Sequence, residues 1–516
     1  MQSRNRLARV VCLLFALSAA SISWGQTALA TITGTIVDAT GAVIANASIS
    51  VRNLENGQVS TASSSETGNY SVLQLPIGDY DMTITVAGFK TYTHTAFHLA
   101  AAQVMREDVT LEVGQTTESV TVTAEASLLK TETTTVAQNV TLAQLNNLPV
   151  LGVGTTGSGF RDPFASVRLT AGIQYNNGQN GAPVVATNMV VNGTPANTYG
   201  TRLDGMTMNP TGSRLLANQM QTQPSTDAIE EVAIMTSNFA AEYGAAGGAM
   251  INMVTKSGTN AFHGSLYDYG TNEALYAHQP YVYLRPKIRQ NDMGGTFGGP
   301  VRIPKLYNGT NKTFFFFSME LFKQFNMLNG SVSVPTSAYR NGDFSALIPA
   351  ENRLVTTAAG AYLDPLGRNI PSGTIFDPTT QRAVGTSQVR DPFVGNKIPV
   401  ARFDPVAVKV LSYVPLPAGT NFEKGLAVGN YIGSWNADRT SKIPSIKLDQ
   451  NIGASSRLSF YLQETNTRSP RSPAGADAMP DQITGGIRTF SAGTTARVNL
   501  DHNLSSRLLL HLGIGW

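Results

Sequence analysis

Histidines and carboxylates are the residues whose types and spacing come closest to a chemical site. His94 and His98 are four residues apart, the spacing at which two imidazoles on a helix could share a metal ion. They lie in a region with a β-strand pattern, however, and no third ligand is near them in the sequence. Glu230 and Glu231 are adjacent on an expected strand, so their carboxylates point to opposite faces and cannot share acid–base work. We therefore expect no metal ion and no catalytic pair.

A glycine pattern typical of dinucleotide-binding loops occurs at Gly152, Gly154 and Gly157. That fingerprint needs a helix directly after the glycines. Gly159 and Pro163 stand there instead, so we interpret the stretch as a flexible loop. The sequence has no zinc-protease His-Glu motif, no nucleophile-elbow serine and no phosphate-binding lysine loop. We expect a protein that is not an enzyme and that carries no cofactor.

The N-terminus has the features of a secretory signal peptide, which we assign to residues 1–30. Arginines precede an apolar run over residues 10–22, and a small-residue cleavage site lies at Ala28-Leu29-Ala30, with cleavage after Gly25 as the alternative. The run is shorter than the roughly 20 residues that a membrane helix needs. The single cysteine, Cys12, lies inside this signal, so the exported chain is expected to have neither a disulfide nor a reactive thiol.

The composition favours a β protein with many turns. Charged residues make up 14% of the chain, against about 25% in typical soluble domains, and the sequence contains 48 glycines. The formal net charge is only +3, and lysine and arginine are scattered along the chain. Because a nucleic-acid binder needs a basic stripe or patch, we expect no nucleic-acid partner.

Residues 31–112 have the pattern of a small β-sandwich. Turn glycines separate short alternating segments, and within residues 80–86 the apolar side chains share one face. Five ordered motifs resemble the carboxypeptidase regulatory-like domain. They are Gly34-Thr35-Ile36-Val37-Asp38, Gly41-Ala42-Val43-Ile44-Ala45-Asn46-Ala47, Gly68-Asn69-Tyr70, Leu75-Pro76-Ile77-Gly78-Asp79-Tyr80 and Gly88-Phe89. The resemblance implies a transthyretin-like fold, which is grouped with starch-binding modules, so carbohydrate contact is a hypothesis.

Residues 113–127 are predicted to form a linker with a β-branched alternating segment inside it. That segment resembles a TonB box. An extended segment without a partner can add itself as a strand to the sheet edge of another protein. The alternative is that it forms the last strand of the sandwich, and the sequence does not decide between the two. The candidate residues are Glu118, Ser119, Val120, Thr121, Val122, Thr123 and Ala124.

Residues 128–258 are predicted to form an α+β domain with a short helix at residues 142–148. Four ordered motifs resemble the plug domain of TonB-dependent receptors, and an ordinary α+β domain is the alternative. A plug passes backbone close to other backbone inside a packed lumen, which glycine permits. The residues that we assign to the plug motifs are Asp204, Gly205, Glu230, Glu231, Tyr243, Gly244, Gly247, Gly248, Asn252 and Lys256.

Residues 259–516 are predicted to form strands of an antiparallel outer-membrane barrel. In residues 457–464, apolar side chains alternate with polar ones, as expected for strands between lipid and a polar lumen. Short turns follow some strands, whereas the connection at residues 465–486 is long, as on the two rims of such a barrel. Motifs including Phe262-His263-Gly264-Ser265-Leu266-Tyr267 and Gly294-Gly295-Thr296-Phe297-Gly298-Gly299-Pro300 resemble the start of an Oar-like TonB-dependent receptor barrel.

Residues 330–431 do not alternate and contain many prolines, so we predict a large loop or irregular insertion. Loops of this length are usually functional or disordered. Barrels of the receptor family have about 22 strands, whereas the residues after 258 supply roughly six to eight strand candidates. We therefore expect a mainly β chain with a sandwich, a plug and an incomplete barrel.

The resemblance implies an outer-membrane receptor that takes up a ligand with energy delivered by TonB. The implied partners are TonB with its inner-membrane energising complex, the outer-membrane lipid and an unknown extracellular ligand, with a glycan as one hypothesis. The sandwich and the plug would then lie on the periplasmic side. The alternative is a cell-surface protein that binds carbohydrate or protein and does not transport. The sequence does not identify the substrate.

Overall fold

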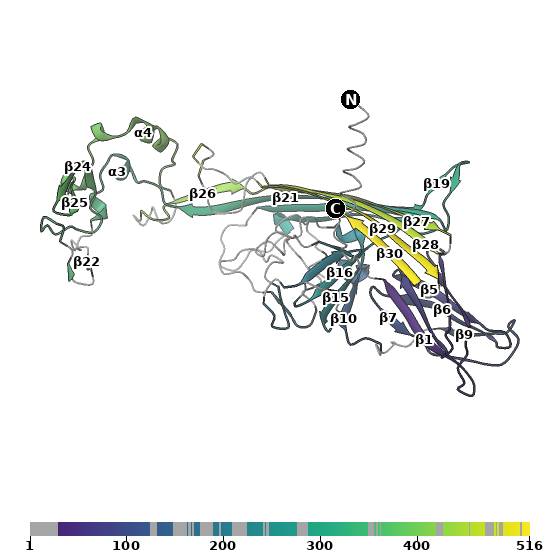
Figure 1. Cartoon of the computed structure of the whole chain (residues 1–516). Helices are drawn as coiled ribbons and strands as arrows, with labels where there is room; N and C mark the ends of the chain where they lie inside the picture. The colour runs from purple at the N-terminus through teal and green to yellow at the C-terminus, as the bar shows by residue number, and fades with distance from the viewer. Residues whose placement is uncertain are drawn as a thin grey trace, which may run out of the picture.

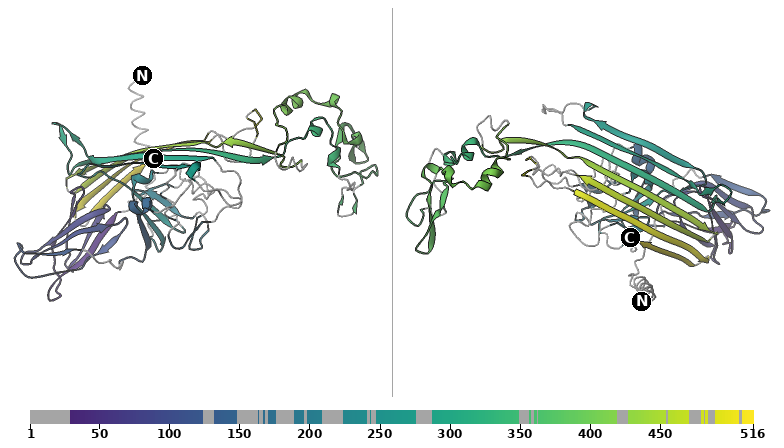
Figure 2. Two further views of the ribbon diagram at one scale, coloured as in Figure 1. Left: turned by 180° about the vertical axis from the view of Figure 1, so that it is seen from behind. Right: turned by 90° about the horizontal axis from the view of Figure 1, so that it is seen from above.

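The computed structural model shows a β-rich molecule in which a sandwich and a second domain lie under one long, tilted sheet (Figure 1). A separate group of small elements projects from the far end of that sheet (Figures 1 and 2). The residues that the structure describes are 29–123, 132–147, 163, 167, 170–175, 189–195, 198–208, 224–240, 243, 247–275, 287–348, 356–357, 360–361, 363–418, 427–453, 455–469, 479–480, 482–483, 489–505 and 508–516. The predicted signal peptide up to residue 28, Ala124, residues 152–157 and Gly244 lie outside them.

The N-terminal part is a sandwich of two sheets, and the mainly β architecture is confirmed. One sheet has the order β4-β1-β7 with β8 also on β1, and the other has the order β3-β2-β5-β6-β9. Side chains alternate between buried and exposed along β5, so its inner face enters a core with Tyr80, Met82 and Ile84. The strands are β1 (Ala30–Asp38), β2 (Ser48–Asn53), β3 (Val59–Ser63), β4 (Asn69–Leu75), β5 (Gly78–Thr85), β6 (Thr91–Leu99), β7 (Val104–Arg106), β8 (Val109–Leu111) and β9 (Ser119–Thr123).

The second domain is built on a sheet of order β10-β15-β16-β13-β14. Most side chains of β15 and β16 are buried, because this sheet is covered on both faces. Gly248 permits a close approach, since a Cβ there would lie 2.5 Å from Thr194 Oγ1. The elements are β10 (Val136–Thr141), α2 (Leu142–Asn147), β11 (Ile173–Tyr175), β12 (Met189–Val191), β13 (Gly200–Leu203), β14 (Met206–Thr207), η3 (Thr226–Ala228), β15 (Ile229–Ser237) and β16 (Met250–Thr255).

The long sheet is antiparallel and has the order β17-β18-β21-β27-β28-β29-β30, with β26 also paired to β21. Along β28 the polar side chains from Ser459 to Thr467 are buried at every second position, as the alternation predicted. Its strands are β17 (His263–Asn272), β18 (Ile288–Pro300), β21 (Thr313–Val332), β26 (Tyr431–Asn436), β27 (Arg439–Ile452), β28 (Ser456–Ser469), β29 (Thr489–Ser505) and β30 (Leu508–Gly515).

The two ends of the long sheet differ in their connections. At the end near the sandwich, β27 joins β28 and β29 joins β30 within a few residues, and a small hairpin of β19 (Arg302–Ile303) and β20 (Tyr307–Asn308) joins β18 to β21. The opposite end has the long connections, one of them preceded by η4 (Glu273–Leu275). No helix among the described residues is long and apolar enough to cross a membrane.

The connection between β21 and β26 contains folded elements, whereas the sequence predicted only a large loop or irregular insertion. A hairpin of β24 and β25 lies beside short helices, and Figure 1 shows this group apart from the long sheet. We call residues 333–430 the insertion. Its elements are α3 (Ser337–Arg340), η5 (Ser345–Leu347), β22 (Thr356–Thr357), β23 (Gly360–Ala361), β24 (Phe376–Val384), β25 (Ser387–Pro392), η6 (Val394–Asn396), η7 (Val400–Arg402) and α4 (Pro405–Leu411).

Candidate functional site: the second domain and its two contacts

Asp204 is the centre of the contact between the second domain and the long sheet. It follows β13, in the turn to β14, with a φ of 43° next to Gly205 at 89°. Its carboxylate accepts from the Thr255 backbone N–H at 2.8 Å and from the Thr255 hydroxyl at 2.5 Å. The guanidinium of Arg497, on β29, donates to the same carboxylate. The turn therefore ties one end of β16 to the wall formed by the long sheet.

Lys447, on β27, completes this group of buried charges. Its ammonium lies 4.0 Å from Asp204 Oδ2 and donates to the backbone oxygen and the hydroxyl of Thr255, both at 2.9 Å. Arg497 also donates to the Leu203 backbone oxygen at 2.8 Å. We call Asp204, Thr255, Lys447 and Arg497 the latch. Each member is almost completely buried, so the charges are held mainly by one another.

The charges around Asp204 keep it ionised despite its burial. Burial alone would raise the pKa of the Asp204 carboxyl, because the charged form loses its hydration. The positive charges of Arg497 and Lys447 and the two hydrogen bonds from Thr255 outweigh burial and lower the pKa to about 2. Removing one partner from a buried pair of this kind costs about 3–5 kcal/mol, since it leaves an uncompensated charge.

The wall around the latch continues the polar pattern of the strands. The Arg497 guanidinium lies 5.2 Å from the centre of the Tyr461 ring, and the Tyr461 hydroxyl donates to Gln463 at 2.6 Å. A second contact lies on β21, where Glu320 accepts a hydrogen bond of 2.6 Å from the Ser225 hydroxyl. The second domain is thus attached to the polar face of the long sheet both at the latch and at Glu320.

The other side of the second domain contacts the sandwich through Glu231. Its carboxylate accepts from the Ala101 backbone N–H at 2.8 Å, and the Asn139 amide donates to the Ala101 backbone oxygen at 3.1 Å. A small apolar group that includes Ala101 and Ala233 lies beside these bonds. Burial raises the pKa of Glu231, and the hydrogen bond from Ala101 offsets this only in part. The adjacent Glu230 is exposed, so the two carboxylates point to opposite sides as expected for a strand.

A cavity of about 630 Å³ lies where the sandwich, the second domain and the long sheet meet. The sandwich and the second domain contribute acidic side chains to its lining, including Glu55, Asp79 and Glu230. Basic side chains, including Lys447 and Arg457, line it from the sheet. Burial and repulsion from Glu230 and Asp79 raise the pKa of Glu55. Lys256 of the second domain and Asp501 of the long sheet also line the cavity, so each side carries charges of both signs.

The candidate TonB-box residues lie at the edge of the sandwich. Residues 119–123 form β9, which pairs in parallel with β6, and the register joins Thr91 to Ser119 and Thr95 to Thr123. The Thr91 N–H donates to the Glu118 backbone oxygen at 2.8 Å. The sequence left two alternatives open for this segment, and this conformation corresponds to a strand of the sandwich.

The remaining predicted plug residues lie in several places. Tyr243 lies under the Arg202 guanidinium, with 5.1 Å between the guanidinium carbon and the ring centre. Asn252 is buried in β16, and the Lys256 ammonium lies 6.0 Å from the centre of the Phe316 ring on β21. Gly247 approaches Thr198, where a Cβ would be 3.2 Å from the threonine Cβ. Only Asp204 among the predicted residues belongs to the latch.

Sequence reasoning did not identify Thr255, Lys447 or Arg497 as members of a site. The signal was present for the last two, because each occupies a polar position in an alternating strand. A charged side chain at such a position faces the inside of a barrel and needs a partner there. The two weighed histidines lie apart from the latch. His94 is buried beside Glu107, and His98 contacts Asp79 at 2.8 Å.

Two family models match this chain. Residues 254–516 match the outer membrane beta barrel domain, and residues 31–112 match the carboxypeptidase regulatory-like domain. Among curated proteins, the TonB-dependent transporter Oar of Myxococcus xanthus is 27% identical over 303 residues, which are 56% of this chain and 27% of that protein. The chain therefore spans about a quarter of the length of this relative.

Two solved structures are similar to part of this chain, each at a low TM-score. A ferric enterobactin receptor of Pseudomonas aeruginosa has a TM-score of 0.37 at 14% identity, over 73% of this chain and 40% of that one. The outer membrane transporter YddB of Escherichia coli has a TM-score of 0.40 at 9% identity, over 74% of this chain and 38% of that one.

Proposed function

This chain belongs to the outer membrane beta barrel family and is an Oar-like TonB-dependent receptor, and on that premise we propose that it takes up an extracellular ligand with energy delivered through TonB. In this proposal the long sheet is part of the barrel wall, and the domain attached to its polar face is the plug. The relatives named above are transporters and receptors, so we propose no catalytic role.

The latch is the observation that carries this proposal. A plug has to close the lumen firmly and still be removable, and a group of buried, mutually paired charges meets both needs. The network around Asp204 is stable while it is dry. Once water enters, the same charges are hydrated and separate at a much lower cost. A pull that admits water beside Arg497 would therefore open the latch.

The connections at the two ends of the sheet support a direction of transport. Outer-membrane barrels have short turns in the periplasm and long loops outside. The short turns of this sheet are at the same end as the sandwich, and the insertion is at the opposite end (Figure 1). We therefore propose that the sandwich and the plug face the periplasm and that the insertion faces the outside.

Strand β9 is the place where we propose that TonB attaches. It is the last strand of its sheet, so one of its edges has no partner strand within the described residues. Because the Glu118 oxygen accepts from β6, the backbone groups of Val120 and Val122 also face β6, while those of Thr121 face the free edge. A strand added at that edge would gain main-chain hydrogen bonds without first breaking those of the sandwich.

A proline pair tests the attachment. Thr121→Pro removes a donor from the free edge and leaves the groups that face β6 in place, and proline is tolerated on an edge strand in that orientation. Thr116→Pro is the control, because residue 116 is the second residue of a turn closed by Glu118 and Gln115, where proline fits. The purified periplasmic domain of TonB should bind the full-length receptor and the control equally, and bind the Thr121 variant at least tenfold more weakly.

Transport itself is measured in cells as accumulation of a radiolabelled peptide digest or a radiolabelled starch digest. The full-length receptor should accumulate one of the two, and an uncoupler of the proton gradient or deletion of residues 118–124 should abolish it. Accumulation that survives both treatments would reject energised transport. Surface binding without accumulation would instead support the adhesive alternative.

A further inference from the structure

The hairpin of the insertion contains an unusual bulge. Asp377 pairs with Asp391 and Arg382 pairs with Val389, so the four residues between Asp377 and Arg382 face Arg390 alone. A bulge bends its strand and redirects side chains, and bulges are common next to active sites. Here it opens a hollow under β24.

Ion pairs hold both sides of the bulge in place. Arg402 contacts Asp377 with two hydrogen bonds, of 2.6 and 2.8 Å. Arg368 and Arg382 both donate to Asp391, each at 2.7 Å. The bond from Arg382 and then that from Arg368 lower the pKa of Asp391 to about 2. Single exposed ion pairs contribute little, but forked pairs within a network fix geometry. The hollow is therefore preformed.

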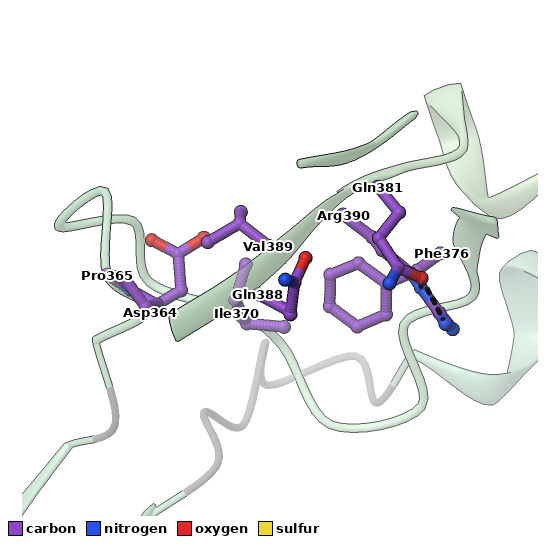
Figure 3. Close-up of a pocket in the computed structure, with 8 residues that line it drawn as sticks. All are labelled: Asp364, Pro365, Ile370, Phe376, Gln381, Gln388, Val389 and Arg390. Atoms are coloured by element: carbon purple, nitrogen blue, oxygen red, sulfur yellow. Dashed lines mark hydrogen bonds between the residues drawn. The ribbon is translucent and has the colours of Figure 1, made fainter. Parts of the chain in front are cut away.

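The hollow is a pocket of about 410 Å³ with an apolar base and a polar rim (Figure 3). This volume is within the usual range for sites of small molecules, about 300–1,000 Å³. Ile370 and Val389 are buried in the base, and the Phe376 ring is partly exposed beside them. Figure 3 shows the ring between Gln388 and the bonded pair of Arg390 and Gln381.

Arg390 differs in its partner from three other arginines of the insertion. Arg368, Arg382 and Arg402 are each paired with a carboxylate. Within the described residues, Arg390 has the amide oxygen of Gln381 as its partner, at 3.0 Å from Nε and 2.6 Å from the terminal nitrogen. An amide oxygen does not neutralise a guanidinium, which is the fork that suits a carboxylate best. The Gln381 oxygen thus occupies a position in which a carboxylate would bind more strongly.

We propose that the pocket under the bulge binds a carboxylate attached to an apolar body, with the carboxylate on Arg390 and the body on Phe376, Ile370 and Val389. Gln381 would turn aside and donate from its amide nitrogen, and Gln388, at the rim, would add a second donor. A peptide that ends in an apolar residue and a fatty or aromatic acid share this chemistry. The inference rests on the proposed function in naming the class of ligand that the receptor would first capture outside the cell.

A neutral sugar and a cation fit the pocket less well. A sugar would use the Phe376 ring but would leave the charge of Arg390 without a counter-charge. A cation would meet that charge directly, and the carboxylate of Asp364 is already engaged by Arg368 at 2.7 Å. Charge on the ligand is therefore the feature to vary first.

The test uses the full-length receptor in detergent with 3-phenylpropionate and its uncharged amide as probes. Binding is followed by saturation-transfer NMR and titration calorimetry. The acid should bind with a Kd of about 1 mM, as expected for so small a ligand, and the amide should bind at least tenfold more weakly. A short peptide with a C-terminal phenylalanine and a medium-chain fatty acid, tested separately, identify the source of the carboxylate.

Two variants with the same loss of charge locate the site. Arg390→Gln should weaken the acid at least tenfold, whereas Lys409→Gln, on α4 and away from the pocket, should leave it unchanged. Phe376→Ala should weaken the acid and the amide alike, and circular dichroism shows whether each variant folds. Equal binding of acid and amide, or binding of the acid that survives Arg390→Gln, would overturn the inference. Uptake of another ligand would continue in that case, so the loss of this inference is separable from the loss of the proposed function.

Discussion

The second domain, which we propose to be the plug, is held from two sides by contacts of different kinds. On the barrel side, Asp204 is almost completely buried between two cations and two hydrogen-bond donors. On the sandwich side, Glu231 accepts one backbone N–H, beside a small apolar group. The charges of the latch lower the pKa of the Asp204 carboxyl. At the sandwich contact, burial raises the pKa of the Glu231 carboxyl. The barrel therefore stabilises the charged form of its carboxyl, and the sandwich contact disfavours that form.

This difference implies an order of events under force. A pull on β9 acts first on the sandwich, whose described bonds to the second domain are the two hydrogen bonds of Ala101 and a partly exposed ion pair between Arg106 and Glu132. We expect the sandwich to separate from the plug before the latch opens. The sandwich would then act as a tether that transmits the pull to the chain leading into the plug, whereas the latch sets the force at which the plug moves.

The largest effect is expected from opening the latch by mutation. Asp204→Ala leaves Arg497 and Lys447 buried without a carboxylate, which should lower the free energy of unfolding of the plug by about 3–5 kcal/mol. Chemical denaturation followed by hydrogen exchange in β13 and β16 measures it. A double-mutant cycle with Arg497→Gln should give a coupling of about 2 kcal/mol, because the two side chains share one interaction.

The latch comparison would fail on either of two results. Additive effects of the Asp204 and Arg497 variants would mean that the two side chains do not interact in solution. An unchanged exchange rate in β16 in the Asp204 variant would mean that the plug is held elsewhere, for example through Ser225 and Glu320. Asp268→Asn, an exposed carboxylate on β17, is the control and should change nothing beyond about 0.5 kcal/mol.

A smaller effect is expected on the sandwich side, from Glu231→Ala. The variant removes the acceptor of the Ala101 N–H, which should cost about 1–3 kcal/mol for a buried donor left without a partner. The Ala101 amide itself reports the change, as faster hydrogen exchange. Glu230→Ala is the matched control, since the adjacent carboxylate is exposed and its loss should leave the Ala101 exchange rate unchanged. Slow exchange at Ala101 in the Glu231 variant would show that the apolar group alone holds the sandwich.

Much of this arrangement could be predicted from the sequence, and the parts that could not have a common cause. Alternation along residues 457–464 identified a barrel strand, because one face needs lipid and the other needs polar neighbours. The motif around Asp204 predicted a plug domain, and Asp204 lies in the contact between the second domain and the long sheet. Its partner Arg497 lies 293 residues further along the chain, and only the strand register brings it there. The bulged hairpin was missed because ion pairs hold it, and ion pairs leave no periodic pattern.

The smallest effect is that of pH, and it distinguishes the two contacts by sign. The raised pKa of Glu231 means that docking of the sandwich is favoured while this carboxyl is protonated and loses that advantage as pH rises from about 4.5 through the raised value. The lowered pKa of Asp204 means that the latch has its full strength above about 4 and loses it only as pH falls through about 2. As pH rises above about 4.5 and through the raised pKa of Glu231, exchange at Ala101 corrected for its intrinsic rate should therefore rise while exchange in β16 stays constant. The rise should be smaller than the effect of Glu231→Ala, because ionised and protonated Glu231 can both accept from Ala101.

Glu231→Gln should remove the pH dependence of exchange at Ala101. A dependence that survived this change would belong to another titratable group of the cavity, with Glu55 as the next to test.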